Sequence, residues 1–147
     1  VARERTGFSL GPSMAASGIV GGGTAFLQDA GSFEISGAFV AAAFIRYIAH
    51  IINRLQGVSF VGEFLGGMTA AATGTVLNYY FPWLKQDAII IGGIMPLVPG
   101  MAITNAIRDV MAGDLISGMT RGMDAALTAV AVAMGVMIVL LIRAGGG

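Results

Sequence analysis

Residues 86–109, QDAIIIGGIMPLVPGMAITNAIRD, decide what kind of fold this chain adopts. The segment is apolar over a length that can cross a membrane, but Pro96 and Pro99 interrupt it near its centre. Because proline has no amide hydrogen, the carbonyls of Gly92 and Met95 lose their helical partners. In lipid such carbonyls must be satisfied by other groups. The segment therefore predicts a membrane helix that is broken close to the bilayer midplane.

The composition of the whole chain agrees with a location in the lipid bilayer. Of its 147 residues, 56% are hydrophobic and only 11% are charged, and the mean hydropathy is +0.83. The net charge is zero and the basic residues are scattered, so no basic patch indicates nucleic acid as a partner. Cysteine is absent, one histidine cannot form a histidine-rich metal site, and no common enzyme motif is present. We therefore expect no metal, no cofactor and no enzymatic activity.

Five segments are long enough to cross a bilayer, which requires roughly 20 apolar residues. They are residues 7–27, 33–53, 58–81, 88–107 and 122–142. We predict an all-α polytopic membrane protein in which residues 1–147 form one five-helix transmembrane bundle, with a Pro/Gly-broken fourth helix. The link over 108–121 is expected to be an interfacial turn or a short helix. Because the chain starts at Val1 rather than at methionine, we also expect a fragment that begins mid-protein.

The basic residues predict the orientation of this bundle. Those on the N-terminal side of the five spans are Arg3, Arg5, Arg46, Arg54, Arg108 and Arg121, and those on the other side are Lys85 and Arg143. Since Lys and Arg accumulate on the cytoplasmic side, the N-terminus is expected to be cytoplasmic and the C-terminus outside.

The broken helix also predicts a binding site. Pro99 suits the first position of a new helix, because its φ is already fixed at a helical value. This half-helix would direct the amides of Gly100 and the next two residues, and the positive end of its dipole, towards the membrane centre, where a carboxylate is the natural ligand. Many secondary transporters use such a broken helix. The predicted substrate-binding residues are Gly92, Gly93, Pro96, Pro99, Gly100, Thr104 and Asn105. The alternative is a plain proline kink.

Charged side chains within the spans form a second set of candidates. Arg46 and His50 lie four residues apart on one face of the second span, and Glu63 near the start of the third span is the expected partner of Arg46. That pair is either structural or part of a gate. His50 either relays protons or is simply an interfacial residue. The predicted gating and charge-compensating residues are Arg46, His50, Glu63, Arg108, Asp109, Asp114 and Arg121. For Arg108 and Asp109 the alternative is an interfacial charge pair.

Small residues recur at a spacing of four, as in Gly18 and Gly22, or Gly118 and Gly122. This spacing allows two helix backbones to approach closely, and we predict that these glycines pack helices together. The run over 21–23 contains three consecutive glycines and is expected to mark a kink or a lining position, because glycine weakens a helix.

The motifs around the break resemble the threonine/serine exporter family (the ThrE and YjjP type). The family's P-L-V-P-G break stands here at 96–100, T-N-A-I-R-D at 104–109, the G-D pair at 113–114, S-G-x-x-R-G at 117–122, and a glycine-rich first hairpin at 21–29. The resemblance implies a multi-pass exporter of the bacterial inner membrane for threonine and serine, or for dicarboxylates such as succinate in two-protein members. It also implies a soluble N-terminal domain and a second membrane half, which we expect to be missing from this chain.

We therefore predict half of a secondary exporter for small carboxylate-bearing solutes. With an odd number of spans, a related second half would insert inverted, and the site would form where the two repeats meet. The expected partners are the lipid bilayer, the small-molecule substrate, and a homologous second half or further copies of the chain. One alternative is a non-transporting membrane scaffold or assembly subunit, in which the prolines only kink a helix. Another is a channel-like pore.

Overall fold

The computed structural model describes residues 10–56 and 59–146, and every structural statement below concerns these residues. They form helices and no strands, which confirms the predicted all-α class. The helices are α1 (Leu10–Leu27), α2 (Ser32–Gln56), α3 (Ser59–Tyr80), α4 (Gln86–Ile94), α5 (Gly100–Met111) and α6 (Leu115–Gly145), with a short 3₁₀ turn, η1 (Met95–Leu97), between α4 and α5.

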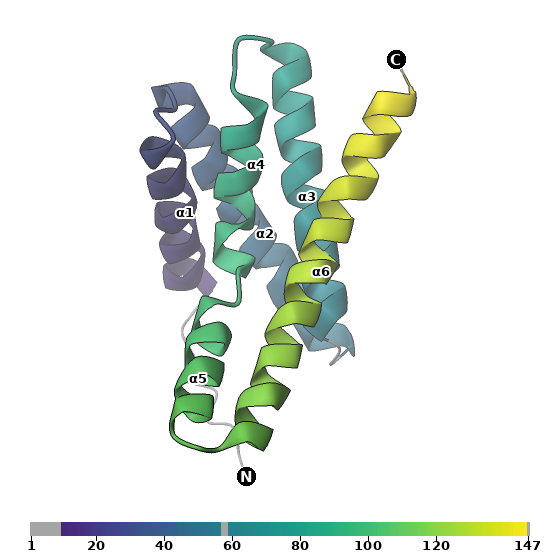
Figure 1. Ribbon diagram of the computed structural model, residues 1–147. Helices are drawn as coiled ribbons and strands as arrows, with labels where there is room; N and C mark the ends of the chain where they lie inside the picture. The colour runs from purple at the N-terminus through teal and green to yellow at the C-terminus, as the bar shows by residue number, and fades with distance from the viewer. Residues whose placement is uncertain (1–9, 57–58, 147) are drawn as a thin grey trace.

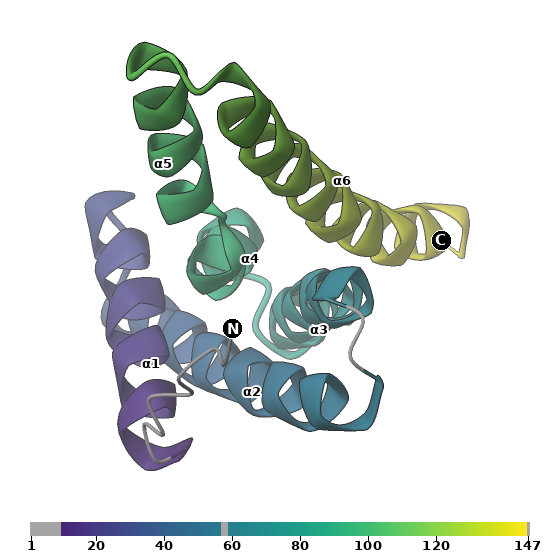
Figure 2. The ribbon, with the colours of Figure 1, turned by 90° about the horizontal axis from the view of Figure 1, so that it is seen from below.

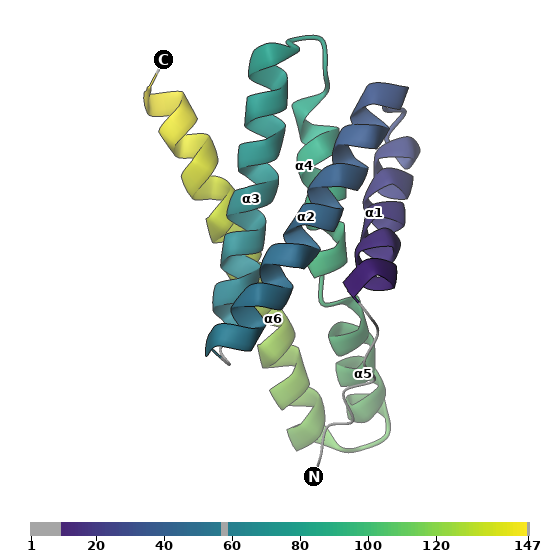
Figure 3. The ribbon, with the colours of Figure 1, turned by 180° about the vertical axis from the view of Figure 1, so that it is seen from behind.

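The helices form an up-and-down bundle (Figure 1). The α1–α2 turn, the α3–α4 loop and the end of α6 lie at one end of the bundle, here called the Trp83 end. The α5–α6 turn lies at the opposite end, here called the Gly113 end. Figures 1 and 3 both show that the α5–α6 hairpin extends beyond α1 and α2 at the Gly113 end.

Helix α4 occupies the centre of the bundle, where it contacts α1, α2 and α3 (Figure 2). Its packing depends on small residues. A Cβ atom added to Gly92 would lie 2.7 Å from the carbonyl oxygen of Gly21 in α1, and one added to Gly93 would lie 3.2 Å from the Cβ of Ala70 in α3. The two backbones at the α1–α4 crossing therefore touch directly, as expected where helices associate through small residues.

Glycine serves the same purpose where α6 crosses α3 and α5. An added Cβ at Gly67 would meet the backbone of Val132, and one at Gly118 would lie 2.9 Å from the carbonyl oxygen of Ala106. This bears out the prediction of glycine packing. Helix α1 runs without a break through its three consecutive glycines. The first of them, Gly21, packs against α4.

The link between the last two helices differs from the prediction. We expected an interfacial segment over 108–121, but α5 continues to Met111 and α6 already begins at Leu115. Gly113 adopts a φ of 88°, which allows a tight reversal, and the side chain of Asp114 caps α6 by accepting a hydrogen bond of 3.1 Å from the amide of Ser117. These two residues shorten the link to a turn.

Two helical segments of the described residues are long and apolar enough to cross a membrane, Phe60–Tyr80 and Leu115–Gly145. The bent pair Gln86–Leu97 and Gly100–Met111 forms a third candidate if it counts as one span. Helices α1 and α2 are not among these candidates, because glycine and serine lower the mean hydropathy of α1 and charged residues lower that of α2. The chain is thus an all-helical protein with two to three candidate spans, and the five crossings stay a prediction.

Candidate substrate-binding break and charged hairpin

The fourth predicted span is broken where its prolines predicted a break. Helix α4 ends at Ile94, η1 contains Pro96 in its first turn, and α5 begins at Gly100. The axes of the two halves are bent by 52°. Since proline can neither donate its amide nor sit easily inside a helix, the chain changes to 3₁₀ geometry and then restarts.

The new helix starts one residue later than expected. Pro99 is the N-cap residue rather than the first helical residue, with φ −79° and ψ 50°. Its carbonyl accepts a hydrogen bond of 3.0 Å from the amide of Ile103, and the amide of Gly100 donates to the carbonyl of Val98 at 2.8 Å. The Gly100 amide is therefore not available to a ligand. Among the described residues, only the amides of Met101 and Ala102 remain without an acceptor at this end of α5.

Of the two carbonyls that were expected to be free, that of Met95 has a hydrogen-bond partner and that of Gly92 has none among the backbone hydrogen bonds of the described residues. The carbonyl of Met95 accepts a hydrogen bond of 3.2 Å from the amide of Val98, because the 3₁₀ turn brings the two groups together. The carbonyl of Gly92 faces the backbone of Gly21, and both Gly92 and Gly93 are buried against neighbouring helices. The prediction of a free carbonyl is thus wrong for Met95, while for Gly92 it is not contradicted, and the open side of the break is the first turn of α5. An added Cβ at Gly100 would have no atom within 4 Å.

Thr104 and Asn105 lie one turn further along α5. The hydroxyl of Thr104 donates to the carbonyl of Gly100 at 2.9 Å, so its hydrogen is engaged with its own helix. Asn105 is half-buried and its side chain forms no hydrogen bond within the described part of the chain. Their contact with a substrate stays a prediction.

Asp109 organises the turn between α5 and α6. Its carboxylate accepts a bond of 3.2 Å from the Nε of Arg121 and another of 3.2 Å from the hydroxyl of Ser117. Its carbonyl accepts the amide of Asp114 at 2.9 Å. The second half of the family-like motif, from Asp109 to Arg121, is therefore one structural unit that joins the two helices.

Arg108 does not take part in this unit. It is exposed and forms no ion pair with the described residues, so the structure does not show the alternative of an Arg108–Asp109 charge pair. Successive residues of a helix point about 100° apart, as follows from 3.6 residues per turn, and α6 supplies Arg121 on the side of Asp109.

Arg46 and Glu63 do not form the expected ion pair either. The Nε of Arg46 donates a hydrogen bond of 2.9 Å to the hydroxyl of Ser13, because α1 packs along this side of α2. Glu63 lies one helical turn before Gly67, which packs against α6. His50 is exposed. Arg3, Arg5 and the side chain of Arg54 lie outside the described residues, so the predicted orientation is untested.

Glu34 is a structural residue that the sequence prediction overlooked. Its side chain is only 6% exposed, accepts a hydrogen bond of 2.7 Å from the amide of Lys85 and accepts another from the amide of Gly31. Gly31 is the residue before α2 and Glu34 is its third helical residue, which is the geometry of a capping box. An acidic residue three positions after a candidate N-cap is the signal that could have identified it.

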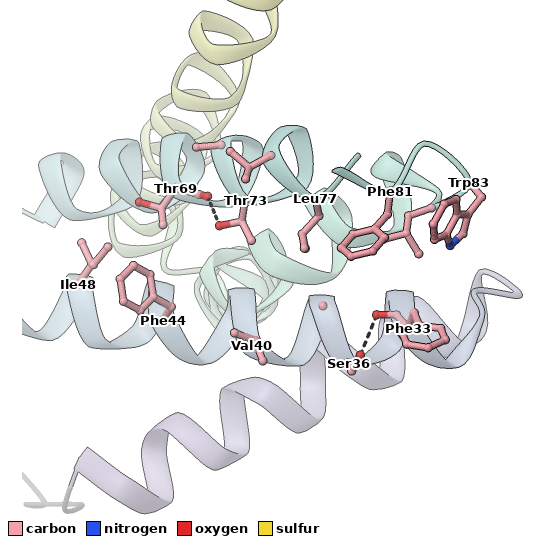
Figure 4. A pocket seen from close by; sticks show the side chains of 14 residues that line it. Phe33, Ser36, Val40, Phe44, Ile48, Thr69, Thr73, Leu77, Phe81 and Trp83 are labelled. Carbon is pink, nitrogen blue, oxygen red and sulfur yellow. Dashed lines mark hydrogen bonds between the residues drawn. The ribbon is translucent and has the colours of Figure 1, made fainter. Parts of the chain in front are cut away.

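An apolar groove with a volume of about 790 Å³ lies between α2 and α3. Figure 4 shows its lining, which runs from Phe33 and Trp83 at the Trp83 end to Ile48. The hydroxyls of Ser36, Thr69 and Thr73 each donate to a carbonyl of their own helix, at 2.8, 2.7 and 2.8 Å. The hydroxyl hydrogens in the groove are thus engaged within their own helices, and the groove contains none of the predicted substrate-binding residues, so it is not the predicted substrate site.

The chain is similar to a known protein family. A family model with the description "Putative threonine/serine exporter" matches residues 1–143. No curated protein and no solved structure matches the chain.

Proposed function

Because this chain belongs to the threonine/serine exporter family, which is a family of membrane transporters, we propose that it is one half of a secondary exporter for small carboxylate-bearing solutes. Threonine and serine are the first candidates, and dicarboxylates such as succinate are the second. The proposed location is the bacterial inner membrane, with a cytoplasmic N-terminus. The observation that carries the proposal is the open first turn of α5, directly after the break in the helix.

The first turn of α5 has the chemistry of an anion site. The amides of Met101 and Ala102 lack acceptors among the described residues, and the space around Gly100 is open. The N-terminal end of a helix also carries roughly half a positive charge, which stabilises a nearby anion by about 0.3–2 kcal/mol. A substrate carboxylate would accept hydrogen bonds from these two amides.

The length of α6 supports a position of this turn within the membrane. Arg143 donates to Asn78 and Gln86 at the Trp83 end, so α6 and α4 reach the same level there. The charge-free stretch from 125 to 142 is about 27 Å long at 1.5 Å per residue, close to a hydrocarbon core of about 30 Å. By the same rise, Pro96 lies about 15 Å below Gln86, and the break is therefore about halfway across.

Arg46 is the residue that supports dicarboxylates as the second substrate class. Its guanidinium is bonded to the hydroxyl of Ser13 rather than to a carboxylate, so its charge is not neutralised by an ion pair within the described residues. A dicarboxylate needs a second positive group beyond the helix terminus, and Arg46 would supply it. A zwitterionic amino acid does not require this residue.

A partner is part of the proposal, because α6 is the one described helix that packs extensively against α5. Helix α5 packs against α6, and Ala106 is its buried residue. A homologous second half, or another copy of this chain, would complete the wall of the site. The alternative of a scaffold subunit is favoured by a specific observation, namely that Gly92, Gly93 and the Met95 carbonyl are used for internal packing and bonding.

Counterflow of labelled solute into proteoliposomes separates these functions. The chain is reconstituted with its candidate membrane partner, and labelled threonine, serine and succinate are supplied against an internal excess of the same unlabelled solute. A carrier gives saturable counterflow that Asn105→Ala or Pro99→Ala reduces, whereas a pore gives flux without saturation. A folded complex that shows no counterflow of any of the three solutes contradicts the proposal and supports the scaffold.

A further inference from the structure

A second apolar groove follows the C-terminal half of α6 and reaches the end of α4. It has a volume of about 500 Å³. Its lining consists of Ile94, the last residue of α4, and of six apolar residues of α6 between Ala133 and Ala144. Figures 1 and 3 show that this half of α6 leans away from α4. Because none of the lining side chains carries an oxygen or a nitrogen atom, the groove suits a hydrocarbon chain rather than a polar solute.

The length of this groove matches one leaflet of a bilayer. The groove lies along Leu115–Gly145, one of the segments that qualify as a membrane span. From residue 133 to residue 144 it follows α6 for about 16 Å, at a rise of 1.5 Å per residue. The hydrocarbon core of a bilayer is about 30 Å thick, so one leaflet contributes about 15 Å.

Exposed aromatic residues mark the membrane boundary at the upper end of the groove. Tyr79, Tyr80 and Trp83 are all exposed at the Trp83 end of the bundle. Tyrosine and tryptophan accumulate at the level of the lipid headgroups. Arg143 donates a hydrogen bond to Asn78, the residue before Tyr79, and its guanidinium therefore lies at the same level.

Neighbouring side chains hold Arg143 in place. Its guanidinium donates to the Oδ1 of Asn78 at 2.8 Å and also to the Oε1 of Gln86. The amide nitrogen of Asn78 donates to the carbonyl of Leu84 at 3.0 Å. The amide nitrogen of Gln86 donates to the hydroxyl of Thr75 at 3.1 Å. Since both amide nitrogens are engaged, both amide oxygens are turned towards the guanidinium, which is fixed between α3, α4 and α6.

The positive charge of Arg143 has no counter-charge in the described part of the chain, where it forms no ion pair. A guanidinium has five N–H donors, of which Asn78 and Gln86 take two, so three are left without an acceptor among the described residues. Arginine binds phosphate through two parallel hydrogen bonds. Positions three apart on a helix are neighbours, so Arg143 lies beside Leu140 at the upper end of the groove.

We propose that this groove is a phospholipid site in the leaflet at the Trp83 end. The lipid phosphate accepts hydrogen bonds from the free donors of Arg143, one acyl chain lies along α6, and the end of that chain contacts Ile94. Because the guanidinium is not neutralised by the protein, a lipid with a net negative charge such as phosphatidylglycerol binds best. The site does not depend on which solute the protein carries.

Other occupants fit the groove less well. A free carboxylate or phosphate ion would bind Arg143 but would leave the apolar groove uncovered. A helix is at least about 10 Å wide with its side chains, so a 16 Å length of it would enclose roughly 1,300 Å³. This is more than twice the volume of the groove, which is about 500 Å³.

A lipid in this position would connect α6 to the break. Helix α6 packs mainly against α3 and α5, and α4 packs mainly against α1, α2 and α3. The acyl chain would fill the space between α6 and Ile94, directly before η1. We therefore expect the bound lipid to hold the end of α4 in its place beside α6.

The test is native mass spectrometry of the chain in detergent with added phosphatidylglycerol. Arg143→Gln removes the charge, and Ala133→Phe fills the groove. The matched controls are Arg108→Gln, at an exposed arginine near the Gly113 end, and Ala126→Phe, at an exposed alanine of α6 outside the groove. We expect each of the first two variants to bind the lipid at least fivefold more weakly, as for the loss of one cation near an anionic headgroup, and each control to stay within twofold.

Each outcome decides the proposal. Unchanged lipid binding in folded Arg143→Gln or in folded Ala133→Phe overturns the site, because headgroup and chain must bind together. If Ala133→Phe weakens association with a membrane partner or a second copy instead, the groove holds a helix and the proposal is wrong. If Arg143→Gln does not fold, Ala133→Phe and its control decide. Lipid binding as expected, but without counterflow of any of the three solutes, would overturn the exporter and leave the lipid site in place.

Discussion

Helices α4 and α5 are two halves of one broken span, and they differ in almost every physical respect. In α4 the side chains of Ala88, Ile89 and Ile90 are buried, and three helices surround it. In α5 the buried residue is Ala106, whereas Met101 is 77% exposed and α6 is the helix against which it packs. The prolines thus separate a half that packs against three helices from a half that packs against one, and we expect the second half to be the more mobile one.

The two halves are also held by different kinds of contact. Helix α4 is held by direct backbone contact at Gly21 and Gly92, which tolerates no added atom. Helix α5 is held by the contact with Gly118 and by the polar cluster of Asp109, Ser117 and Arg121. Close packing is rigid because interiors are dense, whereas an exposed polar cluster is weaker and can break and form again.

The largest effect is expected from Gly92→Ala. The added methyl group would overlap the carbonyl oxygen of Gly21, so α1 and α4 must separate, at a cost of about 3 kcal/mol in the free energy of unfolding. Thermal unfolding in detergent measures this cost. Gly100→Ala is the matched control in the other half, since its added Cβ has open space, and we expect a change of less than about 1 kcal/mol. Equal losses in the free energy of unfolding of the two variants would contradict the difference in packing between α4 and α5.

An intermediate effect is expected from Gly118→Ala. Its added Cβ would lie 2.9 Å from the carbonyl oxygen of Ala106, and α5 must move away from α6 at a cost of about 2 kcal/mol. Hydrogen exchange is the measurement, because it reports each helix separately. Faster exchange confined to α5 and the start of α6 would support the difference in packing between α4 and α5. Faster exchange throughout α4 would show that the two halves are not independent.

The smallest effect is expected from Asp109→Ala. The ion pair with Arg121 is half exposed, so together with the Ser117 hydrogen bond it contributes about 1 kcal/mol to the stability of the hairpin. Arg108 lies next to Asp109 and forms no ion pair among the described residues. Arg108→Ala should therefore lower the midpoint of thermal unfolding less than Asp109→Ala does. A larger loss in Arg108→Ala would contradict the assignment of Asp109 as the residue that joins α5 to α6.

The helical class and the place of the break were predictable because their causes are local. Apolar runs of membrane length predict helices wherever they occur, and Pro96 and Pro99 interrupt any helix that contains them. The spacing of Gly118 from its neighbours likewise predicted close helix packing, which the structure confirms. These signals need no knowledge of which helices are neighbours.

The polar partners were not predictable, because they depend on how each helix is rotated and on what lies beside it. Arg46 bonds to Ser13, which is 33 residues away, instead of Glu63. Asp109 bonds to Arg121 across a turn whose tightness depends on the positive φ of Gly113. The Met95 carbonyl has a partner because the chain between the prolines forms a 3₁₀ turn, a geometry that the sequence pattern did not specify.

The most direct test of a mobile half that binds carboxylate is a comparison of Met101→Pro with Ile116→Pro in threonine counterflow. Both residues occupy the second position of a helix and are exposed, at 77% and 83%, and proline there removes one amide donor while the first turn is retained. We expect Met101→Pro to raise the apparent KM about tenfold, since a hydrogen bond to a charged group contributes about 1.5–3 kcal/mol, and Ile116→Pro to change it less than about twofold. Equal counterflow in both folded variants would show that the first turn of α5 does not hold the substrate.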